Sequence, residues 1–441
     1  MAPLTSIVQS ILAFLFVLGV MIFIHEMGHY IAAKLLGIRV EVFSLGFGRR
    51  LFGFKRGDTD YRVSLLPLGG YVKMAGENYD ADLSGDPGEF QSHPKGHRFM
   101  VAVAGPAMNI ALAVILLATT YMLGVPVAKY LQQPAKIGSV EAGSPADQAG
   151  LQTTDIIVAI DGRSVPTWQE AQLRISLSPN QRLLLSIERQ GKVFEQEITT
   201  SIMEGFEAGT IGADPFIDYI ISDIIPGSPA AAAGLQPGDE IVTVTMGNKT
   251  TRGFNESAQL INSSQGQLLR LEVVRDNQVF EQTIAALERE DRWRIGTAVE
   301  VMQLEQYGLL EASKKSLERN YRLTALTFEV VGRIFTGRTS LRAMSGPIEI
   351  ARYSGMAMAM GLVQLVSFMA LISLQLGIFN LMPIPILDGG LIALLAIEGL
   401  IRRDLSMRVK ERIFQVGFIF LVMLMGVVIF NDLAKNLPFL D

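Results

Sequence analysis

The stretch F-I-H-E-M-G-H-Y at residues 23–30 decides how the rest of the chain is interpreted. Its H-E-x-x-H pattern puts His25 and His29 on one helix face, because an α-helix has about 3.6 residues per turn. Both imidazoles can then bind one zinc ion, and the carboxylate of Glu26 can bind the catalytic water beside it. For a pattern this short, a helix with scattered polar side chains is the alternative.

The residues before this motif favour the zinc interpretation. From Ile7 to Ile24 only Gln9 and Ser10 fall outside the apolar residues and glycine. Ionisable residues at the depth of a bilayer are costly and usually functional. At ~1.5 Å per residue this helix rises roughly 27 Å, so His25 is expected near the cytoplasmic edge of a ~30 Å hydrocarbon core. The segment lacks a basic leader and a cleavage site, which predicts a retained membrane helix rather than a signal peptide.

Composition predicts an integral membrane protein that also carries a soluble part. The chain has 441 residues, of which 49% are hydrophobic and 18% charged, and its mean hydropathy is +0.33. Its small negative net charge of −5 does not indicate a nucleic-acid-binding protein. Cysteine is absent, so a zinc ion would have to be held by histidine and carboxylate groups.

Four segments have the length and apolarity to cross a bilayer, which takes about 20 residues. They are residues 7–36, 99–124, 361–400 with an interruption, and 411–431. Basic residues gather at 39–62, after the first span, and at 402–412, between the third and the fourth. The positive-inside rule therefore predicts that both loops are cytoplasmic and that residues 125–360 lie on the other side of the membrane.

The region between the first two spans contains two candidate strands, at residues 41–48 and 61–74, both bounded by glycines. A small surface hairpin is one interpretation. The other is a sheet that dips toward the active site and offers its edge to an extended peptide. Further along, Asn109 opens the second span. We expect it to hydrogen-bond a neighbouring helix, and a role beside the metal is the less favoured alternative.

The interrupted third span supplies a carboxylate. Its sequence N-L-M-P-I-P-I-L-D-G-G at residues 380–390 breaks the helix with two prolines and a glycine pair. Broken backbone at membrane depth is tolerated where it lines a cavity or is buried in protein. Asp388 is the only acid between Glu349 and Glu398, and it would complete a His₂-carboxylate set with an open fourth position. A helix-capping aspartate is the alternative.

The long segment between the second and third spans contains an internal repeat. G-S-P-A occurs at 143–146 and again at 227–230, and A-G-L at 149–151 and again at 233–235. The constant offset predicts two copies of one β-rich module, and the pattern resembles bacterial PDZ domains, which add a peptide strand to a sheet edge. Small β domains without a ligand are the alternative. Thr153-Thr154 stands where the second copy has Pro237-Gly238, so the first copy departs from the pattern at this turn. After the second copy, residues 304–338 have the spacing of an amphipathic helix at the membrane surface, with a solvated connector as the alternative.

These motifs together resemble the site-2 protease family of intramembrane zinc metalloproteases. The resemblance rests on H-E-x-x-H in the first span, N-x-x-P-x-x-x-x-D-G at 380–389 and the paired PDZ-like modules between the second and third spans. It extends to E-x-F-S-x-G-F-G at 41–48, L-P-L-G-G-Y-V-K-M at 66–74 and S-G-P-I at 345–348, and so covers essentially the whole chain. It implies that zinc is held by His25, His29 and Asp388, that Glu26 is the catalytic base, and that Asn380 holds or polarises the substrate. It also implies that residues 41–74 form a membrane-reentrant β structure that clamps an unwound substrate.

The expected fold is a polytopic α-helical membrane protein with four transmembrane helices, a membrane-associated β region and two tandem extramembrane PDZ domains. The expected divisions are the first transmembrane helix with the zinc motif (1–36), the β region and connector (37–98), the second transmembrane helix (99–124), the first PDZ domain (125–207), the second PDZ domain (208–301), an amphipathic helical connector (302–360), the interrupted third transmembrane segment (361–400), and the final loop, helix and tail (401–441).

The resemblance also implies partners and a location. Members of the family cut single-pass membrane proteins that another protease has already trimmed, notably an anti-sigma factor in envelope stress, and remnant signal peptides. It implies a bacterial inner-membrane protein with periplasmic PDZ domains and an active site near the cytoplasmic side. Two other classes remain as alternatives. A membrane ion or zinc transporter would show an inverted repeat of membrane helices, and a PDZ sensor with a structural zinc would show four protein ligands.

Overall fold

The computed structural model describes residues 4–77, 85–203, 208–337 and 345–436. The chain forms two compact units. One consists of Met1–Val125, Gln306–Phe335 and Ser340–Asp441, and is mainly helical. The other consists of Pro126–Glu305 and Thr336–Thr339, and its described part is mainly β.

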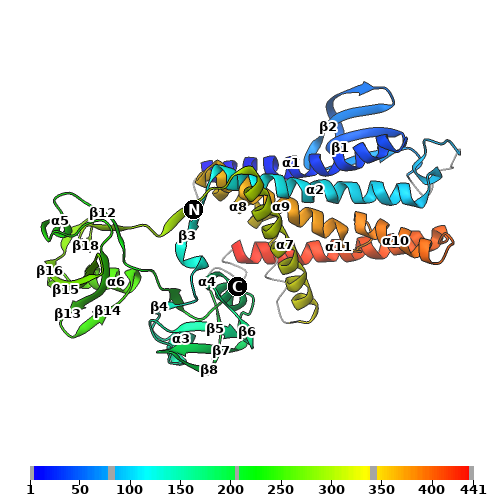
Figure 1. The fold of residues 1–441 in the computed structure, drawn as a ribbon. Coiled ribbons are helices and arrows are strands. Elements are labelled where there is room, and N and C mark those ends of the chain that lie inside the picture. Colours follow the sequence, from blue (N-terminus) through cyan, green and yellow to red (C-terminus); the bar gives the residue numbers. More distant parts are fainter. Residues whose placement is uncertain (1–3, 78–84, 204–207, 338–344, 437–441) are drawn as a thin grey trace. The chain divides into compact units, whose positions relative to one another are not determined.

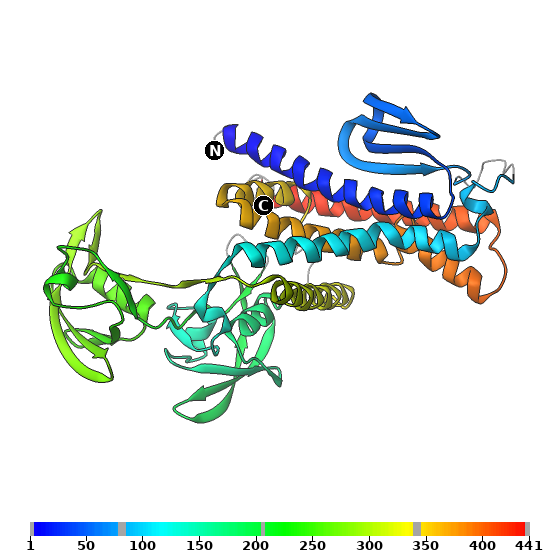
Figure 2. The same cartoon turned by 45° about the horizontal axis from the view of Figure 1, so that its top comes forward.

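The helical unit is a bundle of long helices (Figures 1 and 2). Its helices are α1 (Leu4–Leu35), α2 (Lys95–Leu123), α7 (Leu309–Phe335), α8 (Pro347–Met360), α9 (Leu362–Leu381), α10 (Asp388–Leu400) and α11 (Met407–Asn436), with a short 3-10 helix η1 (Phe90–Ser92) before α2. Within the described residues, four stretches are long and apolar enough to cross a membrane, namely Ser6–Leu35, Lys95–Leu123, Leu362–Leu381 and Arg408–Ala434. The prediction of four helices that could span a membrane is confirmed. The interrupted third segment consists of a spanning helix, α9, and a separate shorter helix, α10.

The S-G-P-I motif at 345–348 lies at the start of a helix. Pro347 is the first residue of α8, a position where the N–H that proline lacks would have no partner within the helix. Helix α7 is amphipathic as predicted, but the face it buries is small and polar. It buries Ala312, Ser316, Asn320 and Thr327 and leaves large apolar side chains exposed, among them Leu310 at 87%. The Ser316 hydroxyl donates to the carbonyl of Val114 in α2 at 2.7 Å, and polar side chains of this kind join helices in lipid.

The region between α1 and α2 is one long antiparallel hairpin, formed by β1 (Val40–Arg56) and β2 (Thr59–Met74). These strands are longer than the two predicted segments, and β1 pairs twice. Its residues 42–45 pair with residues 70–73 on one side and with residues 60–63 on the other. The hairpin lies at the end of the bundle where α1 ends (Figure 1). Apart from β1, no described strand pairs with residues 70–74, so their other side is a free sheet edge.

The β unit contains two similar modules, each with a four-stranded sheet. One sheet has the order β6-β5-β7-β8 and the other β14-β13-β15-β16. The strands are β3 (Val125–Ala128), β4 (Ile137–Val140), β5 (Ile156–Ile160), β6 (Arg163–Ser164), β7 (Arg182–Arg189), β8 (Lys192–Thr199), β9 (Ser201–Ile202), β10 (Gly209–Thr210), β11 (Ala213–Pro215), β12 (Ile221–Ile224), β13 (Glu240–Met246), β14 (Lys249–Thr251), β15 (Leu268–Arg275), β16 (Gln278–Ala285), β17 (Leu287–Arg289), β18 (Arg292–Arg294), β19 (Thr297–Val299) and β20 (Met302–Glu305). The helical turns are η2 (Lys129–Gln132), α3 (Pro145–Gln148), α4 (Trp168–Ser176), α5 (Pro229–Ala232) and α6 (Phe254–Ser263).

The turn that differs in sequence between the two modules keeps the same geometry. Thr154 adopts a left-handed φ of 74°, and Gly238 adopts 95°. The Thr154 N–H donates to the carbonyl of Ile137 at 2.7 Å, and the Gly238 N–H donates to that of Ile221 at 2.8 Å. The departure in sequence therefore leaves the turn geometry unchanged, because the hydrogen bond holds a threonine in a conformation that glycine adopts freely.

Candidate metal centre and active site

Two helices of the bundle bring three potential metal ligands together. His25 and His29 project from α1, and Asp388 is the first residue of α10. The Asp388 carboxylate lies 3.1 Å from Nε2 of His25 and 3.4 Å from Nε2 of His29. The donor atoms of all three lie within 4.8 Å of one another. Two imidazoles and a carboxylate around one point are a donor set that fits zinc.

The rings of both histidines are oriented by α2. Nδ1 of His29 lies 2.8 Å from the carbonyl oxygen of Val101, so Nδ1 carries the proton and Nε2 is free to bind a metal. Nδ1 of His25 lies 3.2 Å from the side-chain amide of the fully buried Asn109. Oδ1 of that amide has no hydrogen-bond partner among the described residues.

Metal binding by Nε2 of His25 decides which way the Asn109 amide points, because Nδ1 must then carry the proton. With the amide rotated by half a turn, so that Oδ1 takes the place of the nitrogen in this contact, Oδ1 accepts a hydrogen bond from Nδ1–H of His25. His25 then has Nε2 unprotonated and ready for a metal, as His29 has. The structure thus places Asn109 beside a metal ligand, which was the less favoured of its two interpretations. Its backbone carbonyl also accepts from Ser373 of α9 at 2.7 Å.

The broken segment between α9 and α10 positions Asp388. Ile386 adopts a φ of 85°, which is strained for a β-branched residue. The chain then turns so tightly that a Cβ on Gly389 would lie 2.1 Å from the carbonyl oxygen of Met382, and one on Gly390 would lie 2.5 Å from that of Ile384. The glycine pair is needed because backbone occupies the space of a side chain there.

A second close approach joins α1 to α2 at the motif itself. A Cβ on Gly28 would lie 2.4 Å from the carbonyl oxygen of Ala104, and one on Gly105 would lie 2.3 Å from Nε2 of His29. Small residues allow such contact between membrane helices. The glycine within H-E-M-G-H therefore lets α2 approach closely enough to orient both histidines.

The three ligands and Glu26 line one cavity of about 450 Å³. Asn380, at the end of α9, lines the same cavity. The free edge of β2 forms another wall, through residues 69–72. The backbone of Val72 hydrogen-bonds the carboxylate of Glu26, and a Cβ on Gly70 would lie 3.1 Å from Cγ of Glu26. A free strand edge thus runs directly past Glu26 and the three potential ligands.

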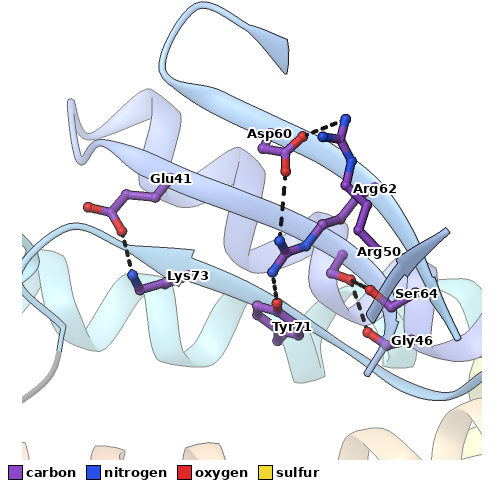
Figure 3. A network of polar contacts seen from close by, with 9 residues as sticks. Glu41, Gly46, Arg50, Asp60, Arg62, Ser64, Tyr71 and Lys73 are labelled. Carbon is purple, nitrogen blue, oxygen red and sulfur yellow. Dashed lines mark hydrogen bonds and ion pairs between the residues drawn. The ribbon is translucent and has the colours of Figure 1, made fainter. Parts of the chain in front are cut away.

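Phe47 and Tyr71 form an aromatic pair in the cavity lining, and a polar network contacts Tyr71 (Figure 3). Phe47 stacks on Tyr71, with ring centroids 6.0 Å apart. The Tyr71 hydroxyl accepts a hydrogen bond from Arg62. Arg62 and Arg50 both pair with Asp60, at 3.7 Å and 3.2 Å. This network connects Asp60 and Arg62, at the start of β2, to Tyr71 in the cavity lining.

Known proteins show which family has this arrangement. The model of peptidase family M50 matches residues 13–424. The chain belongs to peptidase family M50. It is therefore a zinc metalloprotease of the site-2 type. This M50 peptidase is 32% identical over 457 residues to a regulator of sigma E protease of Haemophilus influenzae, with 98% of this chain and 100% of the relative covered. It is 31% identical over 459 residues to the regulator of sigma-E protease RseP of Escherichia coli, with 98% and 99% covered.

The sequence-predicted residues of this M50 peptidase all lie at one place. His25, Glu26, His29, Asn380 and Asp388 line the same cavity. Sequence reasoning missed the carbonyl of Val101 and the packing of Gly105 on His29. The G-P-A-M-N sequence at 105–109 was the available signal, since small residues at the start of a membrane helix indicate close packing.

Proposed function

We propose that this M50 peptidase hydrolyses peptide bonds within the membrane spans of single-pass proteins, with zinc held by His25, His29 and Asp388. The observation that carries the proposal is the convergence of these three side chains within 4.8 Å in a cavity that Glu26 and a free strand edge also line. Both histidines come from a helix apolar enough to cross a membrane, so the chemistry would take place at bilayer depth.

In the proposed mechanism, Glu26 moves the protons. Zinc, when bound, supplies Lewis acidity that activates water and polarises the scissile carbonyl. Glu26 takes the proton of the attacking water and then gives it to the leaving amine. The backbone of Val72 orients the Glu26 carboxylate. Asn109 and Val101 hold the two imidazoles with Nε2 directed at the ligand cluster.

The substrate must be extended before it can react, because a helix hides its carbonyls in internal hydrogen bonds. The free edge at residues 70–74 can accept an added strand and so hold the unwound segment beside Glu26. Asn380, which lines the same cavity, would hold or polarise the substrate carbonyl. This assigns the hairpin of β1 and β2 a role as a membrane-reentrant clamp.

The physiological setting follows from the relatives' names. Relatives from Haemophilus influenzae and Escherichia coli are called regulators of sigma E. Substrates would therefore be trimmed single-pass proteins of the anti-sigma factor type, and remnant signal peptides. The chain would lie in the bacterial inner membrane, with its active site near the cytoplasmic side. The modules at 125–207 and 208–301 would be tandem PDZ domains in the periplasm that exclude untrimmed substrates.

The test compares the wild type with Glu26→Gln and Asp388→Ala after reconstitution. Glu26→Gln is expected to keep its zinc and lose cleavage of a trimmed single-pass substrate. Asp388→Ala is expected to lose both zinc and cleavage, because only two protein ligands remain. Equal activity of Glu26→Gln and the wild type would refute the assignment of the base. Equal cleavage of substrates with and without their extramembrane domain would refute only the proposal that the PDZ domains exclude untrimmed substrates.

A further inference from the structure

The active-site cavity contains a second carboxylate that the mechanism does not use. Glu77 follows β2 and lines the same cavity as Glu26 and the metal ligands. The backbone N–H of Met74 donates to its carboxylate at 3.0 Å. Burial raises the pKa of Glu77, and the charges of His29 and Glu26 act on it. This acid therefore faces the space in which the substrate reacts.

Glu77 has no cationic partner in the described part of the chain. Lys73, whose charge acts on Glu77, is itself paired with Glu41 at 2.8 Å (Figure 3). The next residues along the chain, 78–84, contain no lysine, arginine or histidine. Buried carboxylates are normally paired with a cation. A cation that enters the cavity would therefore meet the Glu77 carboxylate without a competing cation among the described residues.

The position of Glu77 indicates which part of a substrate could supply that cation. Phe90 and Val101, which line the cavity with Glu77, pack in one apolar cluster with Ala33 near the end of α1. In the proposed orientation this is the cytoplasmic end of the first span. Single-pass proteins carry an excess of lysine and arginine on the cytoplasmic flank of their spans. A strand added along residues 70–74 advances about 3.3 Å per residue, so such a flank would reach Glu77 within a few residues of the cleaved bond.

We propose that Glu77 is a specificity subsite that binds a lysine or arginine side chain at the cytoplasmic flank of the substrate's membrane span. The inference rests on the proposed function. The ion pair would hold the extended substrate in one register, so that the bond presented to Glu26 lies at a set distance from the flanking charge. Charge-assisted hydrogen bonds are among the stronger polar contacts, and the cavity weakens screening by solvent.

The experiment uses trimmed single-pass substrates that differ at one flank position, which carries lysine, glutamine or glutamate. Each is presented to the full-length wild type, Glu77→Gln and Glu77→Lys. Asp58→Asn is the matched control, since it removes one carboxylate charge from the exposed turn between β1 and β2, which lies outside the cavity lining. KM and kcat are measured, zinc content is determined, and binding is measured separately in the Glu26→Gln background.

The wild type is expected to bind the lysine substrate about tenfold more tightly than the glutamine one, which corresponds to about 1.4 kcal/mol. Glu77→Gln is expected to lose this preference while keeping its zinc. Glu77→Lys is expected to favour the glutamate substrate, and Asp58→Asn to behave as the wild type.

Three results would overturn the proposal. Equal binding of the three substrates by the wild type would do so whether or not the variants fold. A lysine preference that survives in Glu77→Gln would do so as well. Loss of zinc from Glu77→Gln, together with equally weakened binding of all three substrates, would assign Glu77 to the metal centre instead. If the wild type cleaves none of the substrates, the proposed function fails, and the binding measurement still decides the subsite.

Discussion

Replacing Gly28 by alanine is expected to damage the metal centre without changing any ligand. The added Cβ would lie 2.4 Å from the carbonyl oxygen of Ala104, where ordinary contact begins at 3.4 Å, so α2 must move away by about 1 Å. The obstacle is backbone and cannot rotate aside. Overpacking of this kind lowers the free energy of unfolding by about 1–3 kcal/mol. This loss opposes the gain of about 1 kcal/mol that alanine brings over glycine in helix propensity.

The displacement matters because α2 orients both imidazoles. Val101 and Asn109 lie on either side of Ala104 along α2 and contact His29 and His25. A shift of about 1 Å near a reacting group can lower the rate by about 100-fold. We therefore expect Gly28→Ala to lower kcat/KM on a trimmed substrate by about that factor and to weaken zinc retention.

The assay measures zinc per chain, thermal unfolding in detergent, and kcat/KM on the same preparation. Gly19→Ala is the matched control, since Gly19 lies on the same helix and an added Cβ there meets nothing within 4 Å. That variant should keep full activity. The reasoning is refuted if Gly28→Ala keeps both its zinc and its activity, or if Gly19→Ala loses as much.

Three further predictions concern other contacts. Asn109→Leu should weaken zinc binding by about 10–100-fold, as measured by competition with a chelator, whereas unchanged affinity would show that Asn109 only packs. Asp239→Asn should lower the protection of the second module against hydrogen exchange by about 2 kcal/mol at neutral pH, because Arg275, 2.6 Å away, holds the pKa of Asp239 below 3.8. That difference should disappear as the pH falls through the folded pKa, and its persistence in acid would contradict the ion-pair explanation. Asp432→Ala should lower the melting temperature, because the Asp432 carboxylate accepts from the backbone N–H of Ile348 at 2.8 Å and so caps α8. An unchanged melting temperature would show that water replaces this cap.

The ligand set could be predicted from sequence because each of its signals is local. His25 and His29 are one helical turn apart, and that spacing determines which face they share. Asp388 stands out because it is the only acid in a long apolar stretch and follows two prolines that break the helix. An acid at membrane depth is costly enough that its presence itself indicates function.

The orientation of the ligands could not be predicted, because it depends on residues far away in sequence. His29 is oriented by a backbone carbonyl 72 residues away, and His25 by an amide 84 residues away. A carbonyl has no sequence signature. Asn109 could be read either as a helix-packing residue or as a support for the metal site, and only the packing of α2 on α1 distinguishes the two.

The hairpin shows the same division between local and tertiary information. Its alternating apolar residues and glycines predicted strands, but the double pairing of β1 depends on how β2 folds around it, since strand register is set by tertiary packing. The amphipathic spacing of α7 predicted a helix, while the choice of its small polar face for burial depended on partners in α2 and α9.

The sequence by itself therefore determined the apolar helices long enough to span a membrane, the internal repeat and the candidate metal-binding residues. Apolar length, helical period and the rarity of charge in lipid are properties of short stretches, and they hold whatever the rest of the chain does. Only the tertiary structure decided which groups orient the histidines, which strand edge borders Glu26, and that Glu77 faces the same cavity. Those features depend on contacts between segments 30 to several hundred residues apart, which are formed by close packing and not by any local pattern.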